Sequence, residues 1–227
     1  MPKIQRSSEE IDAVRERIMD HALDLIVTEG YDGFSMRKLA TRLGIAAKTI
    51  YNYFHNQDEL YLHLLIKGFD QLLDCFEAAV RTAEDPMDQV GAMIRAYVDF
   101  GLDHANIYNL LFTWHVPKYR DYIGTPMEET AHRELTRALK CAEFFMDRMT
   151  ACLGSDIPVN REELRREMIQ IWSQMHGYVA GINNTLLQYM HPDPVSLKEQ
   201  IIGRIVTNTR REVAALAKRM TLKIVPP

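Results

Sequence analysis

Residues 36–54, with the sequence MRKLATRLGIAAKTIYNYF, restrict the fold of this chain more than any other segment. They predict two short helices joined by a tight turn, because apolar residues recur at helical spacing on both sides of a glycine. The apolar positions are Leu39, Leu43, Ile45, Ile50 and Tyr53. Ala40 permits close approach of the two helices, and Gly44 can adopt the positive φ of the turn. With basic residues around this core, the segment indicates a DNA-binding helix-turn-helix.

The charge of this segment differs from that of the whole chain. The chain has 27 basic and 31 acidic residues, a net charge of −4, which argues against coating of nucleic acid by bulk attraction. Residues 35–55 contain four basic residues and no acidic one, which leaves 23 basic and 31 acidic residues, a net −8, elsewhere. Four basic residues could equally form an ordinary solvated surface. The apolar core pattern favours a small DNA-contacting surface instead.

Length and composition set broad limits. The 227 residues can form one large or two small domains, and 47% hydrophobic residues suffice for a substantial core. No run of about 18 apolar residues occurs, so we expect neither a transmembrane helix nor a membrane partner. The first residues, MPKIQRSSEE, lack the apolar core of a signal peptide. The three cysteines have no CxxC spacing, which favours buried free thiols in a reducing cytoplasm.

Helix start signals recur along the whole chain, and strand-like alternation does not occur. Residue pairs that fit the capping box are Ser7/Glu10, Asn56/Glu59, Thr125/Glu128, Asn160/Glu163 and Ser196/Glu199. Asp85–Pro86 and Thr125–Pro126 place proline at a first helical position. The sequence therefore predicts an all-α fold of about nine helices. Their expected ranges are 8–29, 35–42, 46–53, 57–81, 86–103, 105–114, 125–153, 160–190 and 196–219, with irregular loops at 116–124 and 154–159.

We expect two domains with different tasks. Residues 1–56 would form a three-helix helix-turn-helix DNA-binding domain, and residues 57–227 a larger helical effector-binding and dimerisation domain. The helix that begins at residue 57 is long enough to leave the first domain and enter the second. Motion in the second domain could reach the first along it.

The chain resembles the TetR family of bacterial transcriptional regulators over residues 8–65. The segments that carry the resemblance are Gly30–Ser35, Leu39–Ala40, Leu43–Ile45, Thr49–Phe54 and Asp58–Leu60. Trp172, followed by His176 and Gly177, resembles the Trp-His-Gly subgroup of the family's ligand-binding bodies. The resemblance implies a homodimer joined through the last two long helices, here 160–190 and 196–219, a ligand cavity in each body, and usually repression.

Two positions depart from the family pattern. Ala46 stands where the family often has Ser, so a hydroxyl cap and a phosphate contact are lost. Gln57 stands where the family often has Lys, and it can donate a hydrogen bond to phosphate without bringing a charge. We therefore expect weaker non-specific DNA binding than in relatives, with a shallower salt dependence.

Roles on DNA follow from position on the two short helices. Lys48 could reach guanine O6 or N7, Ala46 or Ala47 a thymine methyl, and Thr49 either. Tyr51 and Tyr53 could donate to phosphates, although Tyr53 also fits the core. Ser35 could contact a phosphate or only cap its helix. The full set of DNA-binding candidates is Ser35, Arg37, Arg42, Ala46, Ala47, Lys48, Thr49, Tyr51, Asn52, Tyr53, His55 and Gln57.

The second domain is rich in methionine and aromatic residues. Such residues are more often core than cavity, but their number suits a site for a small apolar or aromatic effector. The effector candidates are Tyr97, Phe100, Trp114, Phe145, Met149, Trp172, Met175 and His176. For His176, a hydrogen bond to a neighbouring residue is the alternative role. We expect the effector to reduce DNA affinity.

Enzyme chemistry finds little support in the sequence. Motifs such as GxSxG, HExxH or a phosphate-binding glycine loop are absent, and the nearest acid–base cluster is Asp99, Asp103 and His104. A metal site at Glu128 and His132 would need further ligands. We therefore expect no enzyme activity, cofactor or metal. The predicted function is repression from an inverted-repeat operator bound by a homodimer; the alternatives are an activator of the same fold and a protein–protein adaptor without its own operator.

Overall fold

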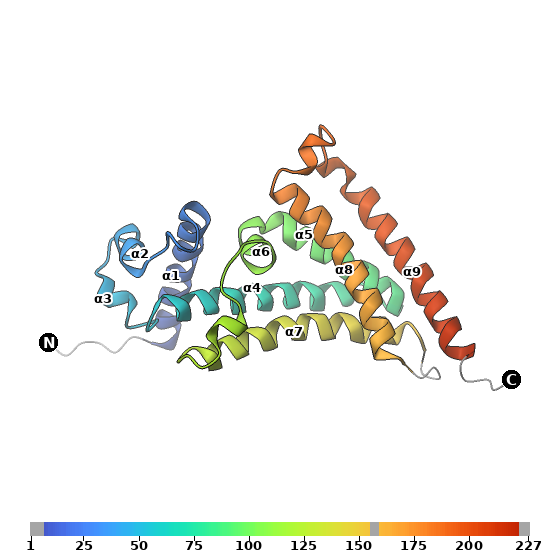
Figure 1. Cartoon of the computed structure of the whole chain (residues 1–227), viewed down its shortest axis with the longest axis horizontal. Coiled ribbons are helices and arrows are strands. Elements are labelled where there is room, and N and C mark those ends of the chain that lie inside the picture. Colours follow the sequence, from blue (N-terminus) through green and yellow to red (C-terminus); the bar gives the residue numbers. More distant parts are fainter. Residues whose placement is uncertain (1–6, 155–158, 223–227) are drawn as a thin grey trace. The chain divides into compact units, whose positions relative to one another are not determined.

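Helices form all regular structure in the described part of the computed structural model, residues 7–154 and 159–222 (Figure 1). The α-helices are α1 (Ser8–Glu29), α2 (Met36–Leu43), α3 (Ala47–Ile50), α4 (Gln57–Val80), α5 (Pro86–Asp103), α6 (Ala105–Phe112), α7 (Glu128–Ala151), α8 (Arg161–Asn183) and α9 (Lys198–Leu222). The 3-10 helices are η1 (Tyr119–Tyr122), η2 (Leu187–Tyr189) and η3 (Val195–Leu197). The predicted all-α fold is confirmed.

Two helices end three or more residues earlier than predicted. The expected helix over 46–53 stops at Ile50, and the backbone N–H groups of Tyr53 and Phe54 both donate to the Ile50 carbonyl. The expected helix over 160–190 stops at Asn183. There Thr185 adopts φ +59°, and the Leu186 N–H returns to the Gly181 carbonyl at 2.9 Å, as in a left-handed helix end.

Caps explain several of the helix starts. Ser7 and Glu10 form both hydrogen bonds of a capping box, and Asp85 accepts from the N–H groups of Met87 and Asp88 ahead of α5. Asn160 accepts from the Glu163 N–H, but the carboxylate of that glutamate accepts from the Asn160 side chain rather than its backbone.

Three further start signals are wrong or incomplete. Thr125 and Pro126 lie in the turns between η1 and α7, and α7 begins only at Glu128. The Ser196 and Glu199 pair is not a box, because α9 begins at Lys198 and the Glu199 carboxylate binds Arg95 instead. Asn56 accepts from the Glu59 N–H at 2.8 Å, whereas the Glu59 carboxylate accepts from the His55 N–H. The predicted loop 154–159 lies largely outside the described residues.

The chain divides into two compact units that are not contiguous in sequence. The first contains the residues up to 68 together with 110–136, and the second contains 69–109 together with the residues from 137 onward. Helices α4, α6 and α7 each contribute to both units. The boundary expected after residue 56 separates a DNA-binding domain from an effector-binding and dimerisation domain, and this functional division stays a prediction.

The core of the helix-turn-helix lies in the first unit. Helices α1 and α2 contact each other, as do α2 and α3. Their shared core includes Ile18, Leu39 and Ile50, all with no exposed surface. Phe54, just after α3, is likewise completely buried. The apolar positions predicted for this small core thus include the residues that hold α2 against α1 and α3.

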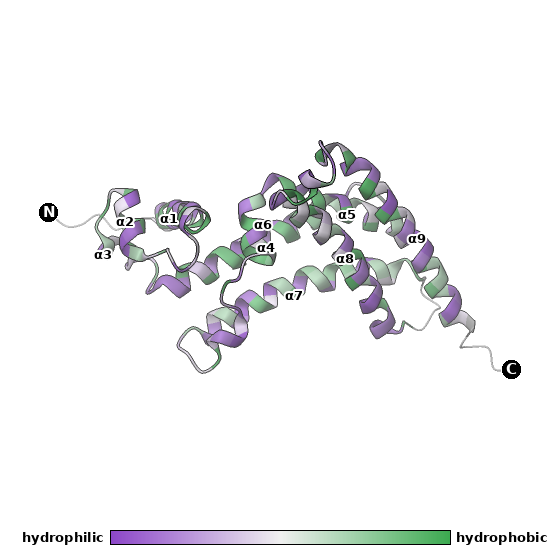
Figure 2. Ribbon diagram, turned by 45° about the horizontal axis from the view of Figure 1, so that its top comes forward, coloured by the Kyte–Doolittle hydropathy of each residue, from purple (hydrophilic) through white to green (hydrophobic). Residues whose placement is uncertain are grey.

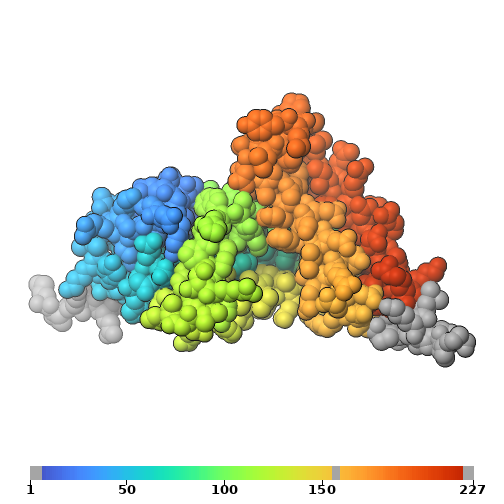
Figure 3. Space-filling model, viewed as in Figure 1, coloured from blue at the N-terminus to red at the C-terminus, as the bar shows by residue number. Residues whose placement is uncertain are grey.

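The core of the second unit lies between α5, α8 and α9, which contact one another pairwise. Hydrophobic and hydrophilic residues alternate along α9, which fits a helix buried on one side (Figure 2). The segment between α8 and α9, orange in Figure 3, lies at the surface and exposes Tyr189 and Met190. Among the described helices, none is both long and apolar enough to span a membrane.

Candidate nucleic-acid interface

Ser35 sets the beginning of α2. Its Oγ accepts a hydrogen bond from the Lys38 N–H at 3.3 Å, while buried Phe34 and Met36 fix the chain on either side. The capping role is therefore observed. A phosphate contact by the same hydroxyl stays a prediction.

Gly44 makes the turn between α2 and α3. It has φ +67° and ψ 29°, in the left-handed region that a side chain disfavours. The following Ile45 N–H donates to the Ala40 carbonyl at 3.1 Å, which completes the end of α2. The turn predicted from the sequence is confirmed, and it fixes where α3 begins.

The start of α3 is exposed and carries one cation. Ala46 is the N-cap residue and makes no side-chain capping bond, as expected from the missing hydroxyl. Lys48 is exposed and makes no ion pair with any described residue. Ala47 and Thr49 are half-buried, and Ile50 anchors the helix in the core. This short helix therefore presents a small, accessible end of the kind that enters a major groove.

The residues after α3 divide into exposed and anchored side chains. Tyr51 is 49% exposed and Asn52 is also exposed, whereas Tyr53 is half-buried. The Tyr53 carbonyl accepts from Arg15 Nη1 at 2.7 Å, which ties this segment to α1. Tyr51 and Asn52 are thus the accessible candidates here, and Tyr53 contributes to the packing.

His55 and Gln57 lie at the approach to α4. His55 is exposed, and its Nδ1 lies 2.8 Å from Glu59 Oε2. Burial alone would raise the pKa of Glu59, but the hydrogen bonds from His55 lower it overall. Gln57, the first residue of α4, is half-buried. An acid therefore pairs with His55, a feature that weakens attraction of phosphate at this residue.

The structure shows that two of the four basic residues of the helix-turn-helix have acidic partners on α1. Lys38 Nζ donates to the Glu29 carboxylate and, at 2.8 Å, to the Gly33 carbonyl. Arg42 Nη2 lies 3.9 Å from Asp24 Oδ2. Arg37 is exposed and, like Lys48, is in no ion pair with the described residues. Counting charge along residues 35–55 could not detect these pairings, because α1 precedes that segment.

Three of the effector candidates belong to one network of hydrogen bonds and stacked rings in the second unit. The Tyr97 hydroxyl is 3.0 Å from the Tyr108 hydroxyl, which is 2.7 Å from His176 Nδ1. The His176 ring stacks on Trp172, with centroids 4.7 Å apart and 10° between the planes. Burial raises the pKa of Tyr97 well above its usual value and lowers the pKa of His176. The alternative for His176, a bond to a neighbour, is observed.

Tyr108 also belongs to this network, although it was not predicted from the sequence. It lies on α6 and is completely buried, so in sequence it reads as one more apolar position of a helix. Only the fold brings it between Tyr97 and His176. Its hydroxyl therefore has a partner on each side, and the predicted role of these residues toward an effector stays a prediction.

The remaining effector candidates are dispersed. Phe145 and Met149 are buried in the second unit, where the Phe145 ring lies 6.2 Å from that of Phe76. Met175 is also buried. Trp114 is half-buried and belongs to the first unit. Phe145, Met149 and Met175 therefore pack in the core, and an effector role for these positions stays a prediction.

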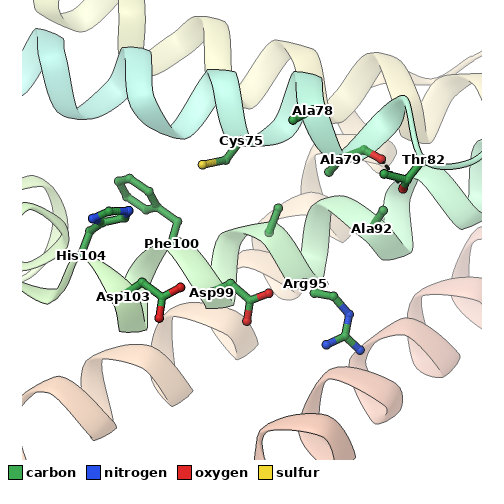
Figure 4. A pocket seen from close by; sticks show the side chains of 11 residues that line it. Cys75, Ala78, Ala79, Thr82, Ala92, Arg95, Asp99, Phe100, Asp103 and His104 are labelled. Carbon is green, nitrogen blue, oxygen red and sulfur yellow. Dashed lines mark hydrogen bonds between the residues drawn. The ribbon is translucent and has the colours of Figure 1, made fainter.

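An open pocket of about 430 Å³ lies between α4 and α5 in the second unit (Figure 4). Alanines from both helices line it, and Phe100 and Cys75 point into the space between the helices. Asp99 and Asp103 lie along its edge on α5, and Arg95 extends away to bind Glu199 on α9 with two hydrogen bonds. Of the predicted effector residues, Phe100 lines this pocket. The described residues contain no group of three His, Cys, Asp or Glu side chains that could hold a metal.

Comparison with known proteins identifies the family. Residues 18–64 match the model of bacterial regulatory proteins of the tetR family, and residues 90–204, half of the chain, match the tetracyclin repressor-like C-terminal domain. The chain belongs to the TetR family. The second match includes Trp172, His176 and Gly177, the residues on which the resemblance of the body rested.

Relatives agree with this assignment. The chain is 28% identical to the HTH-type transcriptional activator FasR of Mycolicibacterium smegmatis over 59% of its own length, and the match spans 58% of that relative. A Rhodococcus protein of unknown function has the same fold, with a TM-score of 0.67, 20% identity, and coverage of 93% of this chain and 97% of the other. The fatty acid degradation regulator FadR of Bacillus halodurans also shares it, with a TM-score of 0.63, 15% identity, and coverage of 89% and 96%. The chain thus combines the sequence signature of the TetR family of bacterial regulatory proteins with the fold of these structures.

Proposed function

We propose that this TetR-family regulator binds an inverted-repeat operator as a homodimer and represses transcription until a small apolar or aromatic effector releases it. The observation that carries the DNA-binding part is the exposed beginning of α3, held by the Gly44 turn and the buried Ile50. At this end Lys48 is accessible and carries a charge that no described acid neutralises. It can therefore reach a guanine edge or a phosphate.

A dimer supports useful specificity, because one three-helix head recognises only a few base pairs. Helices α8 and α9 would supply its interface, as regulators of this family imply. Ile169 on α8 supports this choice, since it is a large apolar side chain with 51% of its surface exposed. Two-fold symmetry then requires an inverted repeat. We expect the regulator to act in the bacterial cytoplasm, where its DNA lies.

The pocket between α4 and α5 is the place we propose for the effector. Its alanine lining leaves space for a small molecule and offers it an apolar surface. Phe100 is buried beside the His104 ring, so it backs the pocket with little surface of its own. This lining suits a small apolar ligand. The hydrogen-bonded network of Tyr97, Tyr108 and His176 would then hold the surrounding helices together rather than bind the ligand.

Activation is a second candidate function. The relative from Mycolicibacterium smegmatis is named as a transcriptional activator, and it is 28% identical over 59% of this chain. The same operator-binding dimer would then recruit transcription rather than block it. The position of the operator relative to the promoter separates the two functions.

Selection of bound fragments from sheared genomic DNA at near-physiological salt tests the proposal. Recovery of an inverted repeat, footprinted over two major-groove faces, supports the operator-binding dimer. If the folded protein enriches no sequence, the proposal fails and an adaptor function remains. A promoter assay with the recovered operator then decides between repression and activation.

A variant at Lys48 assigns its role once an operator is known. If Lys48 reads a base, Lys48→Ala should cost about 1–3 kcal/mol on the operator and relax specificity at one position. A uniform loss across all sequences would make it a phosphate contact. The matched control is Lys140→Ala, which removes an exposed lysine of α7 far along the chain.

A further inference from the structure

The segment between α6 and α7, residues 113–127, belongs to the same compact unit as the helix-turn-helix. We call this segment the connector. Its backbone is held by α4, because the hydroxyl of Tyr61 donates to the Pro117 carbonyl at 3.0 Å. Tyr61 is completely buried, so the bond is shielded from water. The connector is therefore part of the structure that supports the DNA-binding helices.

Asp58 joins the connector to the helix-turn-helix. Its Oδ1 accepts a hydrogen bond from the Tyr31 hydroxyl at 2.8 Å and from the Tyr122 hydroxyl at 3.4 Å. Tyr31 lies between α1 and α2, Asp58 in the first turn of α4, and Tyr122 at the end of η1. One carboxylate oxygen thus links three segments that are distant in sequence.

Both hydroxyls remain donors at neutral pH. Burial raises the pKa of Tyr122 to about 12, and burial with the hydrogen bond to Asp58 raises the pKa of Tyr31. Tyr122 is 5% exposed, so water has little access to replace its bond. Hydrogen bonds to a charged acceptor are stronger than those between neutral groups, which makes a carboxylate an effective shared partner.

Tyr31 transmits this link to the DNA-binding helices. It begins the turn at residues 31–33, which leads directly into Phe34 and the N-cap Ser35 of α2. Its ring meets the edge of the Tyr61 ring, with centroids 4.8 Å apart and 67° between the planes. The position of Tyr31 therefore sets the entry into α2, and both of its contacts come from α4.

We propose that Asp58, Tyr31 and Tyr122 are positioning residues for operator binding, and that the connector controls DNA affinity through them. The inference rests on the proposed function. The connector continues directly from α6, whose residues 105–109 belong to the second unit. A change in that unit can therefore reach Tyr122 along the chain. Withdrawal of Tyr122 leaves Tyr31 as the single hydroxyl on Asp58 and loosens the entry into α2.

Phenylalanine substitutions test the link with little change in packing. Tyr122→Phe should weaken operator binding about 3-fold, and Tyr31→Phe, which removes the shorter bond, about 10-fold. The double variant should lose less than the product of the single effects, because the two hydroxyls share one carboxylate. The salt dependence should stay unchanged, since no phosphate contact is removed. The control is Tyr119→Phe on the same connector, expected within about 2-fold of the wild type because its ring contact with His132 remains.

A measurement without DNA separates this inference from the proposed function. In hydrogen exchange of the free protein, Tyr122→Phe should speed exchange of the amides from 31 to 38, which include the capping N–H of Lys38, while Tyr119→Phe should not. If the wild type binds no operator, the proposed function fails, and the exchange result still tests the link. If the wild type binds but Tyr122→Phe behaves like Tyr119→Phe in both measurements, the inference is overturned.

Discussion

Ala46 is the residue at which the recognition helix begins without help from a side chain. The four N–H groups at the start of a helix need acceptors, and a methyl group offers none. Ala46→Ser should therefore stabilise the protein by about 0.5–1 kcal/mol. Urea unfolding of both proteins measures the difference. Ala47→Ser is the matched control, since that position lies inside α3, and an equal gain there would contradict the capping explanation.

Two histidines make stability depend on pH in the mildly acidic range. Burial lowers the pKa of His63 and of His176 below the usual 6.5, and the nearby Arg15 lowers that of His63 further. The unfolded chain therefore binds these protons before the folded chain does. Their contribution is complete above about pH 6.5 and is lost as the pH falls below it.

We accordingly expect the free energy of unfolding to fall between pH 7 and pH 5.5. Replacement of His176 by Gln should reduce this fall, and so should His63→Gln, because each removes one of the groups that gain a proton on unfolding. Urea unfolding at both pH values measures this change in the free energy of unfolding. His55→Gln is the control, since His55 is exposed on the surface. An unchanged pH dependence in both buried variants would contradict the assignment.

At the scale of elements, the contact between α5 and α8 depends on Gly101. A Cβ there would lie 2.4 Å from Val179 Cγ1 and 2.9 Å from the Tyr108 ring. The two helices would have to move apart, so Gly101→Ala should destabilise the protein by about 1–3 kcal/mol. Gly91→Ala on the same helix is the control, because its Cβ would make ordinary contact with Val206 at 3.4 Å. Thermal unfolding measures both, and equal midpoints would contradict the prediction.

The helices themselves were largely predictable because their signals are local. Ser35 and Gly44 determine the bounds of α2 through bonds to residues three or four positions away, and both roles are visible in sequence. The early end of α8 at Asn183 was not, because its apolar spacing continues beyond the point where Thr185 turns the backbone. Glu199 likewise looked like a cap but binds Arg95, 104 residues earlier in the chain.

The candidate DNA surface was predictable in its position but not in its charge. Lys48 is accessible as expected, whereas Lys38 binds Glu29 of α1. The link from Tyr122 to Asp58 spans 64 residues, so no spacing rule applies to it. Interactions of this kind depend on tertiary structure, and one sequence by itself contains no signal that pairs the partners.

At the scale of the whole molecule, each compact unit combines two stretches that are separated in the sequence. Residues 110–136 come after residues 69–109 of the second unit, yet they belong to the same compact unit as the helix-turn-helix. A sequence-based division at residue 56 assigns them to the effector-binding part. The compact unit that contains the helix-turn-helix is therefore built from two stretches of chain, the residues up to 68 and residues 110–136.

The proposed dimer gives the remaining prediction at this scale. Ile169→Glu on α8 should convert the dimer into a folded monomer, because a charge in an apolar interface is costly and two-fold symmetry repeats it on both subunits. Helical Glu is well tolerated at a residue that is 51% exposed, so the monomer should remain folded by circular dichroism. Leu139→Glu, at an equally exposed apolar residue of α7, is the matched control and should remain dimeric.

Light scattering after size exclusion gives the masses of both variants. A dimeric Ile169→Glu variant would place the interface elsewhere, whereas a monomer that also loses its operator would show that both heads are needed for binding.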